Sequence, residues 1–467
     1  MARESWGMVD VVVVETSELG DRSYLAHDGE TAIAVDPQRD LDRLQAELDA
    51  RGLRVILVLE THVHNDYVSG GLQLAHDHEA RYAVNAADAV AFDRVSVSDG
   101  DELQAGRLRV RVIATPGHTD THLAYVVTDG DGPAAVFTGG SVLYGSVGRT
   151  DLVDPDRTDE LTRAQYRSAH RLAELLDDDA RIYPTHGFGS FCSSGSAAGG
   201  SDSTLGQEKA RNDAYTADDE DTFVAKLVAG LTAYPAYYAH MGARNREGAG
   251  PVDLSPPTQV SPAELQKRIG AGEWVVDLRD RTAYAADHLA GTISIALGQH
   301  FATYLGWLIP WGTALTLIGE TPQQITDAQR QLVRIGIDRP DGAATGELHR
   351  LADGQPTRGY RRATFADLSA AVDAGPAAGG QTGAQLTVLD VRRDDERAHG
   401  AIPGSVHVPL HALLDRLGEI PAGTLWVHCA SGFRASIAAS LLDRAGRHVV
   451  HVDDDYTEAV QTGQATG

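Results

Sequence analysis

The chain has 467 residues, of which 40 are basic and 66 are acidic, so its formal net charge is −26. This acidity makes nucleic acid and anionic membrane surfaces poor partners. The length corresponds to about three domains of ordinary size, whose cores need no disulfide or metal for stability. The two cysteines, Cys192 and Cys429, stand in different motifs, which favours a reducing compartment that keeps both as thiols.

The apolar stretches predict a soluble protein. Residues 1–15 lack the basic start and the long apolar core of a signal peptide, and 11–14 indicate a first strand. The longest apolar stretch, 304–318, is interrupted by Pro310 and is too short to span a membrane. We therefore expect a cytoplasmic protein with no membrane partner. The sequence leaves the oligomeric state open, a homo-oligomer included.

Strand-like and helical runs alternate through the first half of the chain. The expected strands are 11–15, 31–35, 55–60, 110–114, 123–127 and 135–138, and the expected helices are 41–51, 165–176 and 221–231. A Gly- and Pro-rich linker, 248–259, follows them. The organisation predicts three α/β domains, at residues 8–247, 260–339 and 361–460.

The second and third of these domains look like one repeat. Val275–Arg279 mirrors Val388–Arg392, but where the third domain has a cysteine-bearing strand the second has Leu315–Glu320. Gly319 stands in the place of the cysteine, so we expect the second domain to be an inactive copy. Its aromatic segment, Phe301–Trp311, either lines a ligand pocket or packs against a neighbouring domain.

Cys429 follows an apolar run, 425–427, and precedes a helix-forming run, 435–442. At such a turn, backbone N–H groups and the helix dipole converge on the sulfur and favour a thiolate or a persulfide. A buried core cysteine is the commoner alternative, but the Ser-Gly-x-Arg continuation favours a reactive thiol. We predict Cys429 and Arg434 as catalytic residues, in a cradle made of Ala430, Ser431, Gly432 and Phe433.

The spacing of this loop argues against a cysteine phosphatase, in which the arginine follows the cysteine one position later and the loop holds a tetrahedral phosphate. The segment His428–Ala435 resembles the active loop of rhodanese sulfurtransferases, and Val388–Arg392 and His399–Ser405 resemble the strand and turn that precede it in that family. Asp453–Tyr456 departs from the family, which usually has a Gly-Gly turn and a Trp there. The resemblance implies that Cys429 carries a sulfane sulfur.

A second constellation lies near the amino terminus. His62, His64 and Asp66 follow the expected strand 55–60, and imidazoles two residues apart at an extended strand end point the same way. His118 and His186 each stand just past another apolar run. Four histidines in this order favour a metal site over a chance arrangement.

The order and spacing of these motifs resemble the metallo-β-lactamase fold, a four-layer αββα sandwich, and within it the glyoxalase II and persulfide dioxygenase branch. The whole chain resembles fusions of a persulfide dioxygenase with a pair of rhodanese-like α/β domains that have central parallel sheets. This resemblance implies that a low-molecular-weight persulfide is oxidised to sulfite at the first site. Cys429 would then pass sulfane sulfur to sulfite, giving thiosulfate.

Two departures from the family bear on the metal. Tyr67 stands where the motif has a histidine, and Gly140 stands where a Thr-Gly-Asp turn has its metal-binding aspartate. We therefore expect a mononuclear site held by His62, His64 and His118. Three imidazoles suit Fe(II), and they also suit catalytic Zn²⁺. Residues that would orient these ligands or contact substrate are Asp66, Tyr67, His186 and Cys192.

Other interpretations remain open at this point. The histidines could hydrogen-bond one another in a metal-free relic, which would leave a sulfur carrier that works through Cys429 alone. A glyoxalase II-like thioester hydrolase with two zinc ions is weakened by Tyr67 and Gly140. Cys192 could carry a persulfide, or it could be a packed thiol beneath its loop. Metal content distinguishes these interpretations: one iron supports the dioxygenase, two zincs support the hydrolase, and no metal supports the sulfur carrier.

Overall fold

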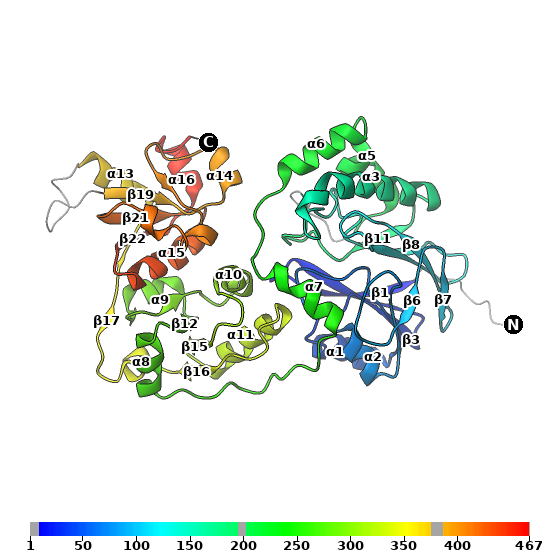
Figure 1. The fold of residues 1–467 in the computed structure, drawn as a ribbon, viewed down its shortest axis with the longest axis horizontal. Coiled ribbons are helices and arrows are strands. Elements are labelled where there is room, and N and C mark those ends of the chain that lie inside the picture. Colours follow the sequence, from blue (N-terminus) through cyan, green and yellow to red (C-terminus); the bar gives the residue numbers. More distant parts are fainter. Residues whose placement is uncertain (1–8, 195–201, 375–385, 467) are drawn as a thin grey trace. The chain divides into compact units, whose positions relative to one another are not determined.

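The computed structural model describes residues 9–194, 202–374 and 386–466. The chain divides into two compact units (Figure 1), the first made of Met1–Asp253 with Arg330–Asp338, the second of Leu254–Gln329 with Arg339–Gly467. The two domains expected at 260–339 and 361–460 thus fall largely in one unit. Among the described helices, none is long and apolar enough to cross a membrane.

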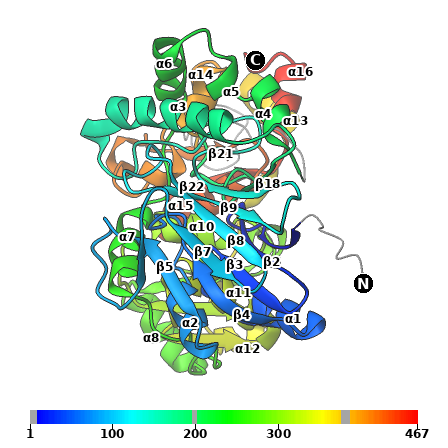
Figure 2. The same cartoon turned by 90° about the vertical axis from the view of Figure 1, so that its right-hand side faces the viewer.

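The first unit contains two sheets (Figure 2). In the six-stranded sheet the strands follow chain order: β1 (Asp10–Thr16), β2 (Asp21–His27), β3 (Thr31–Val35), β4 (Arg54–Leu59), β5 (Arg81–Asn85) and β6 (Val95–Val97). The five-stranded sheet has the order β11 (Arg181–Pro184), β10 (Ala135–Gly139), β9 (Leu123–Thr128), β8 (Leu108–Ala114) and β7 (Glu102–Ala105). The strands β3 to β6 are parallel, whereas β7 to β10 form an antiparallel meander.

Three apolar clusters show how the two sheets are layered. One lies between the sheets and joins Ile33 and Leu57 to Val110 and Phe137. A second packs the outer face of the first sheet on α1 (Asp42–Arg51) and α2 (Gly71–Asp77). A third packs the outer face of the second sheet on α3 (Thr158–Leu175), α4 (Leu205–Arg211), α5 (Asp213–Thr216) and α6 (Glu220–Gly230). Because successive strand residues point to opposite faces, each sheet serves two of these clusters, and the result is the expected αββα sandwich.

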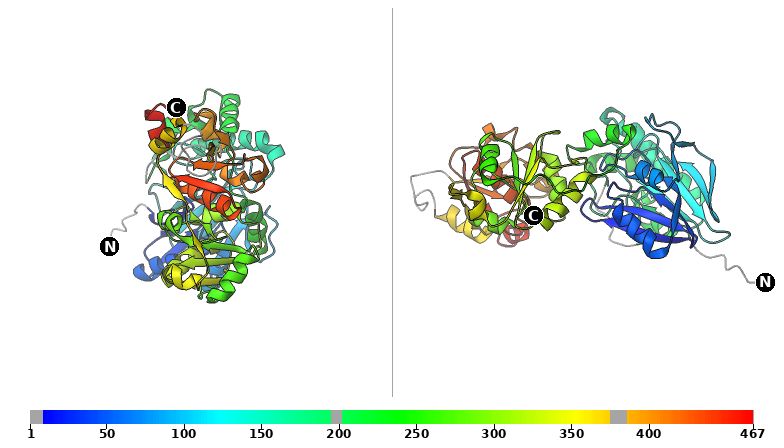
Figure 3. Two further views of the ribbon diagram at one scale, coloured as in Figure 1. Left: turned by 90° about the vertical axis from the view of Figure 1, so that its left-hand side faces the viewer. Right: turned by 90° about the horizontal axis from the view of Figure 1, so that it is seen from below.

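The second unit contains two parallel sheets with a common strand order; Figure 3 shows it in colours from green through yellow to red. One sheet has the order β14 (Ile293–Ser294), β12 (Trp274–Asp277), β15 (Leu315–Gly319) and β16 (Gly342–Thr345). The other has β20 (Val406–His407), β19 (Leu386–Asp390), β21 (Thr424–His428), β22 (His448–Val452) and β18 (Arg361–Ala363). A short antiparallel pair joins β13 (His288–Leu289) and β17 (Thr357–Arg358).

The helices of this unit also fall into two sets. Around the first parallel sheet are α8 (Pro262–Gly270), α9 (Arg281–Ala286), α10 (Phe301–Leu308), α11 (Pro322–Arg334) and α12 (Leu348–Ala352). Around the second are α13 (Phe365–Asp373), α14 (Asp394–Ala398), α15 (Phe433–Arg444) and α16 (Tyr456–Gln461).

The repeat extends to side chains and strand register. Arg279 pairs with Asp277 at 2.7 Å, and Arg392 pairs with Asp390 at 2.7 Å. Ile318 lies opposite Asp277 as His428 lies opposite Asp390. The residue after Ile318 is Gly319 and the residue after His428 is Cys429, so the two positions correspond, as the sequence pattern indicates.

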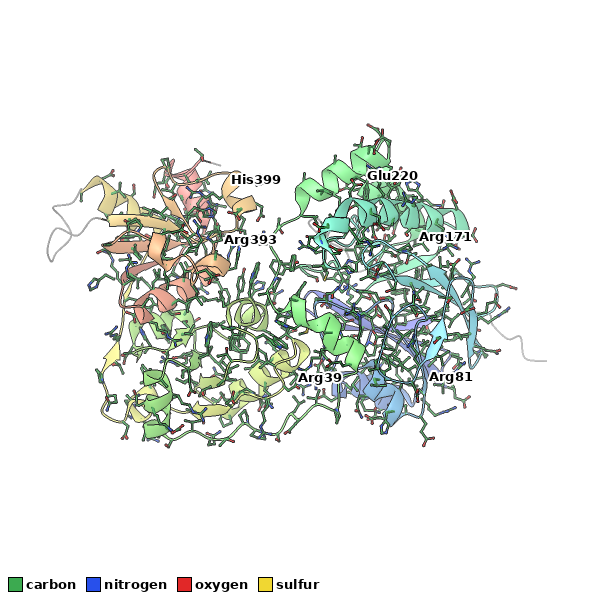
Figure 4. The ribbon with its side chains drawn as sticks, in the orientation of Figure 1. Arg39, Arg81, Arg171, Glu220, Arg393 and His399 are labelled. Carbon is green, nitrogen blue, oxygen red and sulfur yellow. The ribbon has the colours of Figure 1, made fainter. Side chains whose placement is uncertain are left out.

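The carboxyl end of α11 and the residues after it, Arg330–Asp338, belong to the first unit. Part of the domain expected at 260–339 therefore lies in the first unit. Arg334 pairs with Asp40 at 2.7 Å, and both side chains are almost fully buried. The carbonyl of Arg334 accepts a hydrogen bond from the backbone of Val68 at 2.7 Å. Asp338 pairs with Arg39, which Figure 4 labels. Of these contacts, the one with Val68 lies in the chain segment that directly follows His62, His64 and Asp66.

We predict that Arg334→Met lowers the free energy of unfolding by roughly 2–4 kcal/mol, because the buried carboxylate of Asp40 loses its one buried arginine partner and keeps only the partly exposed Arg43 and Arg330. Burial alone would raise the pKa of Asp40, but the charge of Arg334 holds it below the ordinary value. Because the pKa of Asp40 is lower in the folded protein than in the unfolded chain, the ion pair stabilises the fold at pH values above the unfolded pKa. The difference in free energy of unfolding between the wild type and the variant should therefore shrink as the pH falls below about 4.

Urea denaturation at several pH values measures this effect. The matched control is Arg163→Met, whose partners Asp159 and Asp221 are exposed, so that its loss should cost about 0–1 kcal/mol. Equal losses in the two variants would contradict the prediction.

Candidate metal centre and reactive cysteine

Four of the predicted histidines meet at one end of the first unit's sandwich. His62 and His64 follow β4, His118 follows β8, and His186 follows β11. Each is at most 2 % exposed. A buried imidazole needs a partner for each ring nitrogen, so the hydrogen bonds of the four rings show which nitrogen carries the proton.

His62 presents an unprotonated Nε2 to the cluster. The hydroxyl of Thr61 donates to Asp36 Oδ2 at 2.7 Å, so its oxygen accepts from His62 Nδ1 at 2.9 Å. The lone pair of the ring is therefore on Nε2, which lies 3.3 Å from Nε2 of His186. Two such nitrogens at this distance need a proton or a metal ion between them.

His118 is oriented in the same way, with Nδ1 donating to the carbonyl oxygen of Arg149 at 2.7 Å and Nε2 left as the lone pair. The ring lies between two glycines. A Cβ at position 140 would come within 2.2 Å of His118 Cδ2, and one at position 148 would come within 2.7 Å of Nδ1. With the ring in this place, Gly140 cannot be replaced by an aspartate.

His186 is backed by two carboxylates. Its Nδ1 lies 2.9 Å from Asp21 Oδ1 and 3.1 Å from Asp66 Oδ2. Burial alone would lower the pKa of His186, but the charges of Asp66 and Asp21 raise it to about 10. The same charges favour a cation at Nε2, whether a proton or a metal ion. A carboxylate behind a histidine is the usual way in which proteins fix a metal-binding imidazole.

The donor set fits a metal ion. The ligand atoms of His62, His118 and His186 all lie within 4.8 Å of one another. Two nitrogens bound to one tetrahedral metal at about 2.0 to 2.1 Å lie roughly 3.3 to 3.4 Å apart, which matches the separation of His62 and His186. Imidazole nitrogen suits iron, zinc and copper.

His64 and His186 are placed differently from the sequence expectation. His186, expected only to orient ligands or contact substrate, stands beside His62 and His118 with its Nε2 turned to them. His64, expected among the three ligands, has its Nε2 turned to Tyr67 Oη at 3.0 Å, Glu60 Oε2 at 3.2 Å and Asp36 Oδ1 at 3.3 Å. Its Nδ1 is buried and has no hydrogen-bond partner among the described residues.

Tyr67, Asp66 and Cys192 border the same cluster. The Tyr67 ring stacks on His64 with centroids 4.3 Å apart. Cys192 is 1 % exposed, and its thiol contacts the carboxylate of Asp66. Burial and the charge of Asp66 raise the pKa of the Cys192 thiol well above its usual range. At neutral pH this thiol is protonated, so its environment does not activate it as a nucleophile.

Four further residues of the cluster escaped the sequence analysis: Asp21, Asp36, Glu60 and His122. Asp36 accepts from the backbone and the hydroxyl of Thr61, both at 2.7 Å, and from the hydroxyl of Thr185. His122 accepts from the backbone N–H of Gly140 at 2.9 Å. Asp36 directly follows an apolar run, as the histidines do, and that was the available signal.

The second predicted site is built at the turn between β21 and α15. Cys429 follows β21 and is 1 % exposed. Gly432 caps α15 with φ +83°, and a Cβ there would come within 2.2 Å of Asp453 Oδ1, so this position requires glycine. His451 Nε2 lies 2.8 Å from the carbonyl oxygen of Gly432 and holds it. The cradle of Ala430, Ser431 and Phe433 thus has a fixed backbone.

Arg434 faces a carboxylate in addition to the sulfur. Both of its terminal nitrogens bind Glu396, one of them at 2.7 Å from Oε1. Glu396 therefore balances much of the charge of Arg434, which the sequence predicts as a catalytic residue. This pair sets the position of the guanidinium beside the Cys429 loop.

The aromatic segment of the first repeat meets this site within the second unit. Tyr304, Trp307 and Leu308 of α10 line a small cavity together with Val391, Arg393, Leu410, His411 and Arg434. Trp307 stacks on His411 with ring centroids 5.1 Å apart. The segment thus packs on the other repeat, which is one of the two interpretations of Phe301–Trp311, and it also borders this small cavity.

Comparisons with known proteins agree with this architecture. Residues 368–462 match the rhodanese-like domain family. The crystal structure of a metallo-β-lactamase from Staphylococcus aureus subsp. aureus COL is similar with a TM-score of 0.65 and 26% identity, over 73% of this chain and 99% of that one. The first unit therefore has the metallo-β-lactamase fold, and the second contains a rhodanese-like domain.

Curated relatives match the first part of the chain. The mitochondrial persulfide dioxygenase ETHE1 of Homo sapiens is 29% identical over 172 residues, which are 36% of this chain and 65% of that protein. The hydroxyacylglutathione hydrolase of Acidiphilium cryptum (strain JF-5) is 34% identical over 164 residues, 35% of this chain and 62% of that protein. The chain thus spans less than two thirds of the length of these relatives.

The close contact between Gly140 and the His118 ring leads to a prediction. Gly140→Ala should push the imidazole out of the group formed with His62 and His186, because the new Cβ would take its space. We expect metal affinity, measured by competition with a chelator, to fall by about 10–100-fold. Gly250→Ala is the control, since a Cβ there meets nothing within 4 Å. An unchanged affinity in Gly140→Ala would show that His118 is not a ligand.

Proposed function

We propose that this protein is a sulfur-metabolism enzyme with two sites, a metal centre that oxidises a low-molecular-weight persulfide and a cysteine that transfers sulfane sulfur. The observation that carries the first part is the convergence of three imidazole nitrogens, from His62, His118 and His186, in a buried site. Sequence similarity to persulfide dioxygenases supports the choice of substrate. The rhodanese-like match over 368–462 supports the second part.

The first reaction balances as a persulfide anion, O₂ and water giving a thiolate, sulfite and two protons. The sulfur–sulfur bond breaks, and the outer sulfur is oxidised while O₂ is reduced. A ferrous ion, when bound, would supply this redox chemistry. His62, His118 and His186 would hold it, and Asp21 and Asp66 fix the orientation of His186. The neutral ligands leave the centre its full positive charge, which favours an anionic substrate.

The second reaction proceeds through Cys429. Its thiolate attacks the outer sulfur of a persulfide, the organic thiolate leaves, and a cysteine persulfide forms. Sulfite then attacks the outer sulfur of this persulfide, thiosulfate leaves, and the Cys429 thiolate is restored. The N-terminus of α15 and its preceding turn stabilise the anionic sulfur, because their N–H groups and the helix dipole favour negative charge.

A thioester hydrolase is the second candidate, favoured by the similarity to hydroxyacylglutathione hydrolases. A hydrolase with two metals needs a second set of ligands. Tyr67 occupies the motif position of one of these, and its hydroxyl lies 3.0 Å from Nε2 of His64. The tyrosine therefore favours the mononuclear centre and the oxidation reaction.

Metal content and oxygen consumption test the first site together. Protein given ferrous iron anaerobically should hold one equivalent of iron per chain by elemental analysis. It should then consume O₂ and form sulfite when glutathione persulfide is added. His118→Ala should lose both properties. Two equivalents of zinc with thioester hydrolysis would support the second candidate, and protein that binds no metal would leave only the Cys429 chemistry.

Sulfur transfer from thiosulfate to cyanide tests the second site. Cys429→Ser should abolish it, because no other described thiol stands at a strand-to-helix turn. Cys192→Ser should retain most of it, since the Cys192 thiol is buried and protonated. Full transfer in Cys429→Ser would remove this cysteine from the mechanism.

A further inference from the structure

The turn before α15 is backed by β22 and the residues that follow it. The backbone N–H of Tyr456 donates to the carbonyl oxygen of Ala430 at 2.8 Å, and Nε2 of His451 donates to that of Gly432 at 2.8 Å. From the chain between these two donors, the carboxylate of Asp453 packs against Gly432, so closely that a Cβ there would come within 2.2 Å of Oδ1. The segment in which the chain departs from the rhodanese pattern is therefore the back wall of the cradle.

Asp453 places a buried negative charge close to the reactive sulfur. Its side chain is only 6 % exposed. Gly432 follows Cys429 by three residues, and three residues span at most about 11 Å. Like charges at such a distance in a site with little water repel one another with little screening. An anionic sulfur on Cys429 therefore requires that the charge of Asp453 be neutralised. Arg434 does not provide this, because Glu396 binds both of its terminal nitrogens.

Two other arginines neutralise Asp453, and they come from different repeats. Arg362 of β18, in the repeat with the cysteine, binds Oδ2 with its Nε at 3.0 Å. Arg281, the first residue of α9 in the other repeat, binds Oδ1 with its Nε at 2.8 Å. Oδ1 is the oxygen that lies against Gly432. Arg281 therefore neutralises the side of the carboxylate that faces the turn.

The repeat without a nucleophile is also held against the helix that follows the cysteine. Figure 1 shows α9 beside α15. The backbone N–H of Ser294 donates to the hydroxyl oxygen of Ser440 at 2.9 Å, and Arg444 donates to the carbonyl oxygen of Gly272 at 2.6 Å. These contacts fix α15 on the first repeat, so the place of Arg281 beside the turn does not depend on its own ion pair alone.

We propose that Arg281 is a positioning residue for the reaction at Cys429: the inactive repeat supplies the cation that neutralises Asp453, so that the turn holds an anionic sulfur and admits an anionic donor. Arg281 acts on the sulfur through Asp453. The inference rests on the sulfur transfer proposed for Cys429. It gives the repeat that has Gly319 in place of the cysteine a chemical task in addition to its packing.

Three variants separate the charge of this ion pair from its contact. Arg281→Met removes the positive charge but keeps an unbranched side chain, and it leaves Oδ1 of Asp453 without its partner. Asp453→Asn is isosteric, so it removes the negative charge but keeps an oxygen for Arg281 and the contact with Gly432. The double variant lacks both charges. Arg350→Met is the matched control, because it removes an exposed arginine of α12 in the same repeat.

The first measurement compares the rates at which iodoacetate and iodoacetamide alkylate Cys429 in the full-length protein, followed by mass spectrometry of the peptide that contains this cysteine. The same thiolate attacks both reagents, and only iodoacetate is charged, so the ratio of the two rates reports the electrostatic potential at the sulfur. A loss of general stability changes both rates together and leaves the ratio unchanged. The second measurement is kcat/KM for thiosulfate in transfer to cyanide.

We expect Arg281→Met to lower the ratio of iodoacetate to iodoacetamide rates by about 3–10-fold, because an uncompensated carboxylate then faces the turn. Asp453→Asn should raise the ratio, since two arginines then lie behind the turn without their anion. The double variant should be close to the wild type, and Arg350→Met should equal it. The kcat/KM for thiosulfate, a dianion, should follow the same order.

Other results would overturn the inference in distinguishable ways. A wild-type ratio in Arg281→Met would remove this arginine from the site and leave the proposed function intact. A double variant as low as Arg281→Met would show that the contact matters and the charge does not, which would assign Arg281 to packing of the repeats. The expected ratios in a protein that transfers no sulfur from thiosulfate would instead contradict the proposed reaction of Cys429, which the inference needs.

Discussion

The candidate metal centre depends on the carboxylate of Asp36. This side chain accepts hydrogen bonds from Thr61, which precedes His62, and from Thr185, which precedes His186. Two loops that are more than 120 residues apart in the chain are thereby tied to one group. The backbone of Asp36 has φ +49°, an uncommon conformation for a residue with a side chain. Such a conformation persists only where the surrounding contacts hold it, and they do so here at the edge of the site.

Much of the fold could be predicted because the apolar runs follow the rules of buried strands. The six strands expected in the first unit all exist, as do the helices near 41–51, 165–176 and 221–231. β2 was missed because Asp21–His27 is buried on both faces and includes Asp, Arg and Ser, so neither alternation nor apolar content reveals it. α3 begins at Thr158, seven residues before the expected start, because Asp154 and Pro155 open a turn that leads into it.

The candidate site could be predicted only in part, for a physical reason. A histidine just after an apolar run is a visible signal, and all four predicted histidines meet in the structure. The carboxylates that orient them come from separate strand ends; Asp36 and Glu60 follow apolar runs, but Asp21 has no local signature in an acidic chain. Which ring nitrogens face one another follows from those carboxylates, since they decide the direction of each ring. The placement of His186 beside His62 and His118 therefore needed the structure.

The two repeats of the second unit show which features survive without a nucleophile. The pairs Asp277–Arg279 and Asp390–Arg392 are built alike, although only the second repeat has a cysteine. Each arginine also donates to a backbone carbonyl eight residues further on, that of Asp287 or Gly400. The pair is thus part of the scaffold that shapes the turn after the strand. The first repeat keeps that scaffold and adds α10, whose aromatic side chains line the cavity beside Arg434.

The carboxyl end of α11 limits where the chain can be divided into separate proteins. The unit with the metal centre is not one continuous stretch of sequence, because Arg330–Asp338 completes it from beyond the linker. Arg334 meets Asp40, and its backbone meets Val68 just after the histidine motif. A break of the gene between the two units would strand this segment on the wrong polypeptide. A single cut of the chain after Asp253 therefore does not release the complete first unit, because Arg330–Asp338 stays on the other piece.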